Sequence, residues 1–406
     1  MTGAPGLSRR DLLISSASLP ALAALPRPLA RAAGLLPVDP AGRVLVVVQL
    51  TGGNDGLNTV VPFADDDYHR ARPVLAVPPA QALRLTDDTA LHPALAPLLP
   101  LWDEGRLAVL RGVGPPRPDR SHFRSMEMWH TASTDEPAPA TGWLGAVSRE
   151  LEGAAGLPAV RAGGRDLPLA LAGARTQAPA LVGLDDVLIE AAGRGGAAAQ
   201  RERLRCACCA GGRAGEAAWL ADAAGDAFDC AERLALLRGA ARGTFPGGEL
   251  GRALELVALL LGARVGLRVA CVTHDGYDTH ARQQAGHAAL LRDLSAALSA
   301  FDGQLTAQGD RARVAVMVFS EFGRRVRENA SGGTDHGAGN PLLLLGEPVA
   351  GGVHGAPPDL RGDDDEHDVP VTIDFRRMYA AALEWLGVPS AAVLPDHFAP
   401  VPLLTG

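Results

Sequence analysis

The chain has 406 residues, of which 47% are hydrophobic, and a formal net charge of −8 at pH 7. This composition is enough to bury a sizeable core and excludes an intrinsically disordered chain. The negative charge disfavours nucleic acid as a partner, and an aromatic content of 4% argues against a surface that stacks on single strands.

The first 32 residues are predicted to be a twin-arginine signal peptide. Residues 8–13 (S-R-R-D-L-L) resemble the twin-arginine export signal, and residues 30–32 (A-R-A) offer a cleavage site. The Ala-rich apolar segment between them is too short to span a bilayer. We therefore expect a periplasmic or extracellular protein that uses the twin-arginine export machinery and has no stable membrane span. An amphipathic or disordered N-terminus is the alternative.

The first predicted strand covers residues 43–50, a continuous Val-rich run that is typical of a central strand in a parallel sheet. It leads into T-G-G-N-D-G-L-N, where Asp55 places a carboxylate at the carboxyl end of the strand. Ligands of α/β proteins bind at such ends. The segment has the spacing of neither a dinucleotide-binding fingerprint nor a phosphate-binding loop. The alternative is that Asp55 only caps a turn.

A second strand is predicted at residues 107–113, and a helix is predicted to start after Ser121 and to end near residue 130. A hydroxyl at a helix N-terminus beside Arg120 and Arg124 lies in positive potential, which suits a nucleophile that attacks an anionic ester. An ordinary N-cap is the alternative for Ser121. In that case the neighbouring residue His122, and not Ser121, is the functional one, as a metal ligand or general acid.

Residues 157–246 change to an Ala-, Gly- and Arg-rich composition, which we interpret as a peripheral insertion with short strands at 157–160 and 167–171 and helices further on. Three of the five cysteines lie in it close together, namely Cys206, Cys208 and Cys209. An odd number leaves at least one thiol unpaired in the monomer. Their spacing matches no common zinc pattern, so we expect a structural or incidental role.

Two further strands, residues 265–273 and 314–320, are each followed by a polar cluster. Asp278 and His280 follow the first strand, and alternate residues of an extended segment point the same way. Asp335 and His336 follow the second strand in a Gly-rich loop, and His354 comes 18 residues later. Carboxylates with imidazoles are typical metal ligands. Turn residues without a ligand are the alternative. Helices are predicted at residues 250–262, 281–308 and 374–386.

Together these stretches resemble the alkaline phosphatase superfamily, and most closely the bacterial domain-of-unknown-function family 1501, an exported branch of it. The resemblance is carried by residues 50–58, 121–123, 278–280, 320–324 and 333–337, and it covers about residues 43–387. It implies a three-layer α/β/α sandwich with a mostly parallel central sheet. It also implies a metal-dependent hydrolase or transferase that acts on phosphate or sulfate esters, with a small anionic ester or a surface glycan as substrate.

The resemblance further implies two divalent ions, zinc or manganese. Asp278, His280 and His354 would hold one ion, and Asp55, Asp335 and His336 the other. Ser121 would be the nucleophile, with Arg120 or Arg124 stabilising the oxyanion.

Two departures from the superfamily pattern stand out. The pair Asp278 and His280 is closer in sequence than the usual Asp-x-x-x-His, and Asp335 comes 15 residues after Ser320 instead of directly at the strand end. Either the loop folds back to deliver Asp335, or Glu321 has taken over a ligand role. These departures motivate a second hypothesis, a non-catalytic exported binding or assembly protein that engages cell-surface polysaccharide on the same fold.

Overall fold

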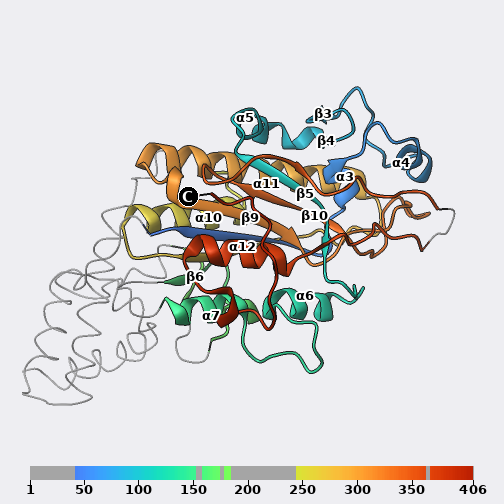
Figure 1. Ribbon diagram of the computed structural model, residues 1–406. Helices are drawn as coiled ribbons and strands as arrows, with labels where there is room; N and C mark the ends of the chain where they lie inside the picture. Colours follow the sequence, from blue (N-terminus) through green and yellow to red (C-terminus); the bar gives the residue numbers. More distant parts are fainter. Residues whose placement is uncertain (1–41, 152–157, 174–177, 184–243, 363–365, 406) are drawn as a thin grey trace, which may run out of the picture.

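A central sheet organises the chain (Figure 1). The computed structural model describes residues 42–151, 158–173, 178–183, 244–362 and 366–405. The strand order is β11-β5-β10-β9-β1-β8-β6-β7, with β12 beside β5. The bounds are β1 Val44–Thr51, β5 Leu107–Gly114, β6 Ala159–Ala162, β7 Ala180–Leu181, β8 Val269–Asp275, β9 Val314–Ser320, β10 Asn340–Leu345, β11 Gly352–His354 and β12 Ile373–Asp374.

The sheet is mostly parallel, as predicted. Among the described strands, β10 alone runs opposite to the others, because it pairs antiparallel with both β9 and β5. β1 pairs parallel with β8 on one side and with β9 on the other. This central position explains the continuous apolar run of β1, since a strand covered on both faces has no solvent side.

Helices cover both faces of the sheet, which gives the predicted three-layer sandwich (Figure 1). Along β1, Val44, Val46, Val48 and Leu50 pack on one face, against α10 (Glu249–Gly262), α11 (Gln283–Gln308) and the 3-10 helix η1 (Pro93–Leu98). Leu45 and Val47 pack on the other face, against α6 (His122–Thr131), α7 (Trp143–Glu150) and α12 (Arg376–Leu386). The alternation follows from the period of two of a strand.

A smaller layer lies beside the carboxyl end of β1. It contains α3 (Gly56–Thr59), α4 (Asp66–Ala71) and a three-stranded sheet of β2 (Val60–Val61), β4 (Ala90–Leu91) and β3 (Leu83–Arg84). The short helix α5 (Leu99–Asp103) follows η1 and contributes Leu101 to the main core. A separate small core holds part of this layer together, with Leu57, Val61 and Tyr68 among its members. The last short elements are three 3-10 helices, η2 (Leu169–Leu171), η4 (Arg311–Arg313) and η5 (Ser390–Ala392).

The predicted insertion at 157–246 begins inside the main sheet. β6 pairs parallel with β8, and β7 continues the same sheet as its edge. The strand predicted at 167–171 is wrong, because this segment contains the 3-10 helix η2. The predicted helices of the insertion, its three cysteines, Cys230 and the predicted signal peptide lie outside the described residues; Cys271 is buried in β8.

No helix in the described part of the chain is long and apolar enough to cross a membrane.

Candidate metal centre

The predicted polar clusters meet at one edge of the sheet. The register pairs Leu50 of β1 with Ser320 of β9, and Thr51 of β1 with Asp275 of β8. The three parallel strands therefore end at the same edge, as predicted. The loops after β8 and β9 meet there, and the first residue of α6, His122, contacts Glu321 directly after β9.

The loop after β9 folds back on itself and returns to this edge. Arg324 and His336 form an antiparallel bridge. The Arg325 amide donates to the Asp335 carbonyl at 3.0 Å, and the Gly337 amide donates to the Gly323 carbonyl at 2.8 Å. This hairpin-like return explains how Asp335 and His336 reach the site although they lie far from the end of the strand.

Four side chains converge there, namely His122, Asp278, His280 and His336, which we call the histidine cluster. His280 Nε2 lies 3.0 Å from Asp278 Oδ1 and 2.9 Å from His336 Nε2. His336 Nε2 and His122 Nε2 lie 3.1 Å and 3.6 Å from the same carboxylate oxygen. Ligand atoms bound tetrahedrally at about 2.0–2.1 Å are about 3.3 Å apart. The ligand atoms of His122, Asp278 and His336 all lie within 4.8 Å of one another, which is the spacing of a ligand set for one ion, and His280 adjoins two of them.

The hydrogen bonds of the three histidines fix which ring nitrogen faces the centre. His122 Nδ1 lies 2.8 Å from Glu321 Oε1, His280 Nδ1 lies 3.0 Å from Asp335 Oδ1, and His336 Nδ1 lies 2.9 Å from the Arg120 carbonyl. These oxygens accept hydrogen bonds, so each Nδ1 carries the proton and each neutral ring has its lone pair on Nε2. Three lone pairs and a carboxylate oxygen then lie close together, with Arg324 Nη1 3.5 Å from His280 Nε2, and a bound cation would relieve the remaining repulsion. Metal-binding histidines use this arrangement of outer partners.

Glu321 is the buried support of His122. Its side chain is fully buried and also accepts from the Gly52 amide at 2.8 Å and from the Ser320 hydroxyl at 3.0 Å. Burial works to raise the pKa of Glu321, but the hydrogen bond from His122 and the backbone and hydroxyl donors outweigh it and hold the pKa below its ordinary value. The same His122–Glu321 hydrogen bond raises the pKa of His122. Glu321 therefore orients His122 and is not itself in the cluster.

Arg324 holds Asp278 in place from the buried side. Its guanidinium is fully buried and donates to Asp278 Oδ1 at 2.8 Å, to the Gly53 carbonyl at 2.6 Å and to the Thr334 carbonyl at 2.7 Å. Burial would raise the pKa of Asp278, but its contacts with the His336 ring and with the Arg324 guanidinium outweigh burial, and the pKa is lowered to about 2. Asp278 is therefore a carboxylate at neutral pH, as a metal ligand requires.

Gly52 allows the loop after β1 to approach Asp278 closely. Its φ is +115°, and a Cβ at this position would lie 2.4 Å from the Asp278 backbone nitrogen. A side chain here is therefore excluded both by backbone conformation and by space.

Asp55, predicted as a ligand, lies in a buried ion pair. Both of its oxygens contact Arg72 Nη1, at 2.8 and 2.7 Å, and Gln283 also hydrogen-bonds to it. Burial favours the neutral form of Asp55, but Arg72 and His287 outweigh it and lower the pKa. Within the described residues no hydrogen bond or ion pair joins Asp55 to the histidine cluster. The structure therefore does not assemble the second ligand set predicted around Asp55.

Asp335 and His354 also differ from their predicted positions. Asp335 Oδ1 contacts His280 Nδ1 and, at 3.2 Å, Asn329 Nδ2, so Asp335 supports His280 from its Nδ1 side. His354 lies on the edge strand β11, which pairs with β5, and its Cα partner is Leu110. β5 and β10 separate this strand from β9. The structure does not bring His354 into the histidine cluster.

The residues predicted to be catalytic at the start of α6 have different environments in the structure, and not all of them reach the cluster. Ser121 is the N-cap of α6, as predicted, but its side chain is exposed and makes no capping hydrogen bond. Arg120 pairs with Asp368 and Glu366, and Arg124 pairs with Glu127 and Glu136. Both arginines therefore tie loops to the start of the helix, and His122 is the residue of this segment that reaches the cluster.

Two functional partners were missed from the sequence. Arg324 belongs to the S-E-F-G-R stretch, but the contact of its fully buried guanidinium with the Asp278 carboxylate gives no local signal in a sequence. Arg72, the partner of Asp55, is the C-cap residue of α4, and nothing in the local sequence marks it as the partner of a buried carboxylate. Both pairings depend on contacts between distant segments of the chain.

Residues 108–399 match the family described as "Protein of unknown function (DUF1501)". The chain belongs to this family. The match starts within β5 and runs past α12, so it includes all four members of the histidine cluster. No curated protein matches the chain.

Solved structures similar to this DUF1501 chain share little sequence with it. A protein in the alkaline phosphatase superfamily from Vibrio parahaemolyticus is 9% identical, with a TM-score of 0.37 over 89% of this chain and 74% of that one. The sulfatase PsFucS1 from Pseudoalteromonas sp. is 12% identical, with a TM-score of 0.34 over 89% and 71%. Ps i-CgsB is 8% identical, with a TM-score of 0.37 over 88% and 75%. Because the sequence identities and TM-scores are so low, these structures give no information about the site of this chain.

Proposed function

We propose that this DUF1501 chain is an exported metal-dependent hydrolase or transferase that acts on phosphate or sulfate esters and holds one divalent ion, zinc or manganese. The observation that carries the proposal is the histidine cluster, where three Nε2 lone pairs and Asp278 Oδ1 face one another. Imidazole and carboxylate ligands suit these ions.

A metal ion bound in this cluster would act as a Lewis acid that polarises an ester oxygen. The residues around the cluster hold its side chains in position and leave them accessible to a substrate. Arg324 keeps Asp278 charged and fixed, and Glu321 and Asp335 orient His122 and His280. The side chains of Asp278 and His280 are 50% and 42% exposed, so a substrate in solvent can reach the cluster.

A single ion replaces the two ions predicted from the sequence. Arg72 already neutralises Asp55, and Asp335 faces the Nδ1 side of His280 instead of the cluster. Neither carboxylate is free to bridge a second ion without breaking a contact in the described structure.

His122 is the proposed ligand at the start of α6, and Ser121 has a structural role. The exposed Ser121 side chain has no hydrogen bond to the cluster among the described residues, whereas His122 lies within it. We expect Ser121→Gly to keep metal content and turnover, because Gly also serves as an N-cap at a cost of a few tenths of a kcal/mol. Lost turnover with intact metal content would restore Ser121 as the nucleophile.

The proposal is tested by assays with an aryl phosphate and an aryl sulfate ester, using the mature protein freed of metal and then loaded with zinc or manganese. We expect turnover of one ester class that needs the added metal and is lost in His336→Ala. The matched control is His397→Ala, which changes a histidine remote from the cluster in sequence. A fully loaded protein that turns over neither ester contradicts the catalytic proposal.

A non-catalytic binding or assembly protein that engages surface polysaccharide is the second candidate. This candidate is favoured by two observations. Asp55 is paired with Arg72 and does not hold the predicted second ion, and Arg120 and Arg124 are paired with carboxylates and do not stabilise an oxyanion. Binding of a sulfated polysaccharide by metal-loaded protein without turnover would support this candidate. Export rests on the predicted signal peptide, and secretion of the full chain compared with an Arg9→Gln/Arg10→Gln variant tests it.

A further inference from the structure

The first residue of α11 is a buried glutamine beside the histidine cluster. Gln283 is 1% exposed and follows His280 by three residues. The helix behind it is fixed on the central sheet, because Leu291 and Leu294 of α11 belong to the main core. The Gln283 amide also donates to the Gly332 carbonyl, in the loop after β9, at 2.8 Å. Gln283 is therefore a fixed point next to two loops that carry cluster residues.

The side-chain oxygen of Gln283 joins these two loops. Oε1 accepts from the Thr334 hydroxyl at 2.7 Å and from the Thr279 hydroxyl at 3.0 Å. Thr279 directly precedes His280 in the loop after β8. Thr334 lies two residues before His336 in the loop after β9. One oxygen atom thus connects the segments that carry two neighbouring histidines, whose Nε2 atoms are 2.9 Å apart.

The side-chain nitrogen of Gln283 faces the loop after β1. Nε2 donates to Asp55, whose carboxylate is held by Arg72. A carboxylate only accepts hydrogen bonds and the two threonine hydroxyls donate to Oε1, so the orientation of the amide is fixed. A single side chain therefore connects the loops that follow β1, β8 and β9.

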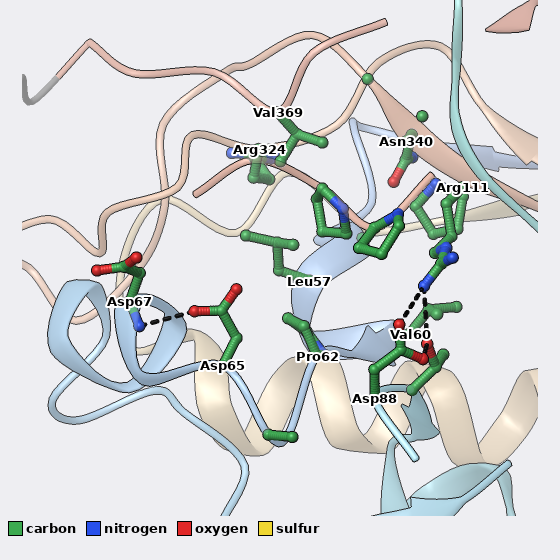
Figure 2. Close-up of a pocket in the computed structure, with 18 of the residues that line it drawn as sticks. Leu57, Val60, Pro62, Asp65, Asp67, Asp88, Arg111, Arg324, Asn340 and Val369 are labelled. Atoms are coloured by element: carbon green, nitrogen blue, oxygen red, sulfur yellow. Dashed lines mark hydrogen bonds and ion pairs between the residues drawn. The ribbon is translucent and has the colours of Figure 1, made fainter. Parts of the chain in front are cut away.

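These hydrogen bonds are shielded from solvent. Gln283 is buried, and the side chain of Asp55 is completely buried. A cavity of about 450 Å³ opens beside α3, with Leu57 and Arg324 in its lining (Figure 2), but neither Asp55 nor Gln283 lines it. Hydrogen bonds are stronger in the protein interior than in water. The contact between Gln283 and Asp55 can therefore hold the loops firmly.

We propose that Gln283 is a positioning residue of the metal centre, with the Asp55–Arg72 pair as its anchor. It fixes the distance between the loop that carries His280 and the loop that carries His336. A functional site requires its side chains to be held within about 0.5 Å of the productive geometry, so a looser connection weakens binding of the ion. The inference rests on the metal centre of the proposed function.

The variant Gln283→Met tests this role, because it replaces the amide by a thioether, a weak acceptor without a donor. We expect the zinc affinity of the mature protein, measured by competition with a chelator, to fall about 10–100-fold, as for other partners that orient ligands. Amide hydrogen exchange in residues 277–281 and 333–336 of the metal-free protein, measured by mass spectrometry, should become faster.

The matched control is Gln304→Met. It changes a second buried glutamine, near the other end of α11, whose Nε2 donates to Gln308 at 3.2 Å. It should leave both the zinc affinity and the hydrogen exchange of the two loops unchanged.

An exchange of donor and acceptor provides a second test. Gln283→Glu places a second carboxylate against Asp55 and should weaken zinc binding as Gln283→Met does. Gln283→Glu/Asp55→Asn restores a donor and an acceptor at this contact, and should bind zinc at least about tenfold more tightly than Gln283→Glu.

Zinc affinity that is unchanged in Gln283→Met, or reduced equally in Gln304→Met, would overturn the proposal, and so would a double variant that binds no better than Gln283→Glu. An unmodified chain that binds no zinc would contradict the metal centre itself. The hydrogen exchange of the metal-free loops would then still support or overturn Gln283 as the connection between them.

Discussion

At the scale of single residues, the account depends on buried charged groups whose partners are distant in the sequence. Asp55 and Glu321 are both completely buried carboxylates at strand ends, yet one faces Arg72 and the other faces His122. The sequence marks both as polar residues after apolar strands and cannot tell which one supports a ligand. Only the packing of the Arg72 segment against the loop after β1 decides the role of Asp55.

Glu321→Gln should weaken the metal site without unfolding the chain. The amide keeps the shape but loses the charge that orients His122, and changes in such outer partners typically cost about 10–100-fold in metal affinity. Zinc affinity measured by competition with a chelator checks this. Glu384→Gln, an exposed change on α12, is the control. Unchanged zinc affinity in Glu321→Gln would show that His122 does not bind the ion.

Arg72→Met should destabilise the fold, because it leaves the Asp55 carboxylate buried without its partner. Removing one member of a buried pair costs about 3–5 kcal/mol. Denaturant unfolding measures the loss, and Arg72→Met/Asp55→Asn should recover part of it. If the single variant is as stable as the unmodified chain, Asp55 is not held by Arg72 and becomes available as a ligand again.

At the scale of elements, the strands and their common edge follow from the sequence. The predicted strand at 314–320 coincides with β9, and the helix predicted after Ser121 coincides with α6, because buried apolar runs and an N-cap are local signals. The return of the loop after β9 is not local. It depends on glycines that let two backbone segments touch, so the sequence left open whether Asp335 could reach the site.

Gly52→Ala should disturb the histidine cluster from outside it. A Cβ would meet the Asp278 backbone, and the residue would be held at a φ of +115° that side chains avoid. Strain of this kind costs roughly 1–3 kcal/mol. We expect lower stability in denaturant and weaker zinc binding together. Gly105→Ala is the control, since it also has positive φ but no atom within 4 Å of its Cβ. A loss of stability with unchanged zinc affinity would show that Gly52 does not help to position Asp278.

At the scale of the whole molecule, the three-layer sandwich could be predicted from the sequence, but the edge strands of its central sheet could not. The central strands are continuous apolar runs, whereas β6 and β7 are short, and their pairing with β8 is set by contacts across the sheet. His354 shows the same limit, because its spacing from His336 resembled a ligand pattern while the chain carried it to the edge strand β11.

Acid should destabilise the whole fold between about pH 6.5 and 4. Burial lowers the pKa of both His130 and His287 to about 4. The unfolded chain then binds protons first as pH falls, so stability is complete above 6.5 and is lost towards 4, by up to about 3 kcal/mol for each histidine. Denaturant unfolding across this range measures the slope, and His287→Gln should flatten it. A slope that does not change in His287→Gln would contradict the neutral buried state of this residue.

The most direct test of the central claim is the number of zinc ions that the metal-free mature chain binds in calorimetric titration. The account predicts one ion per chain, with binding lost in His336→Ala and kept in Asp55→Asn and His354→Ala. Two ions per chain, or loss of binding in Asp55→Asn with the fold intact, would contradict a centre built from His122, Asp278, His280 and His336.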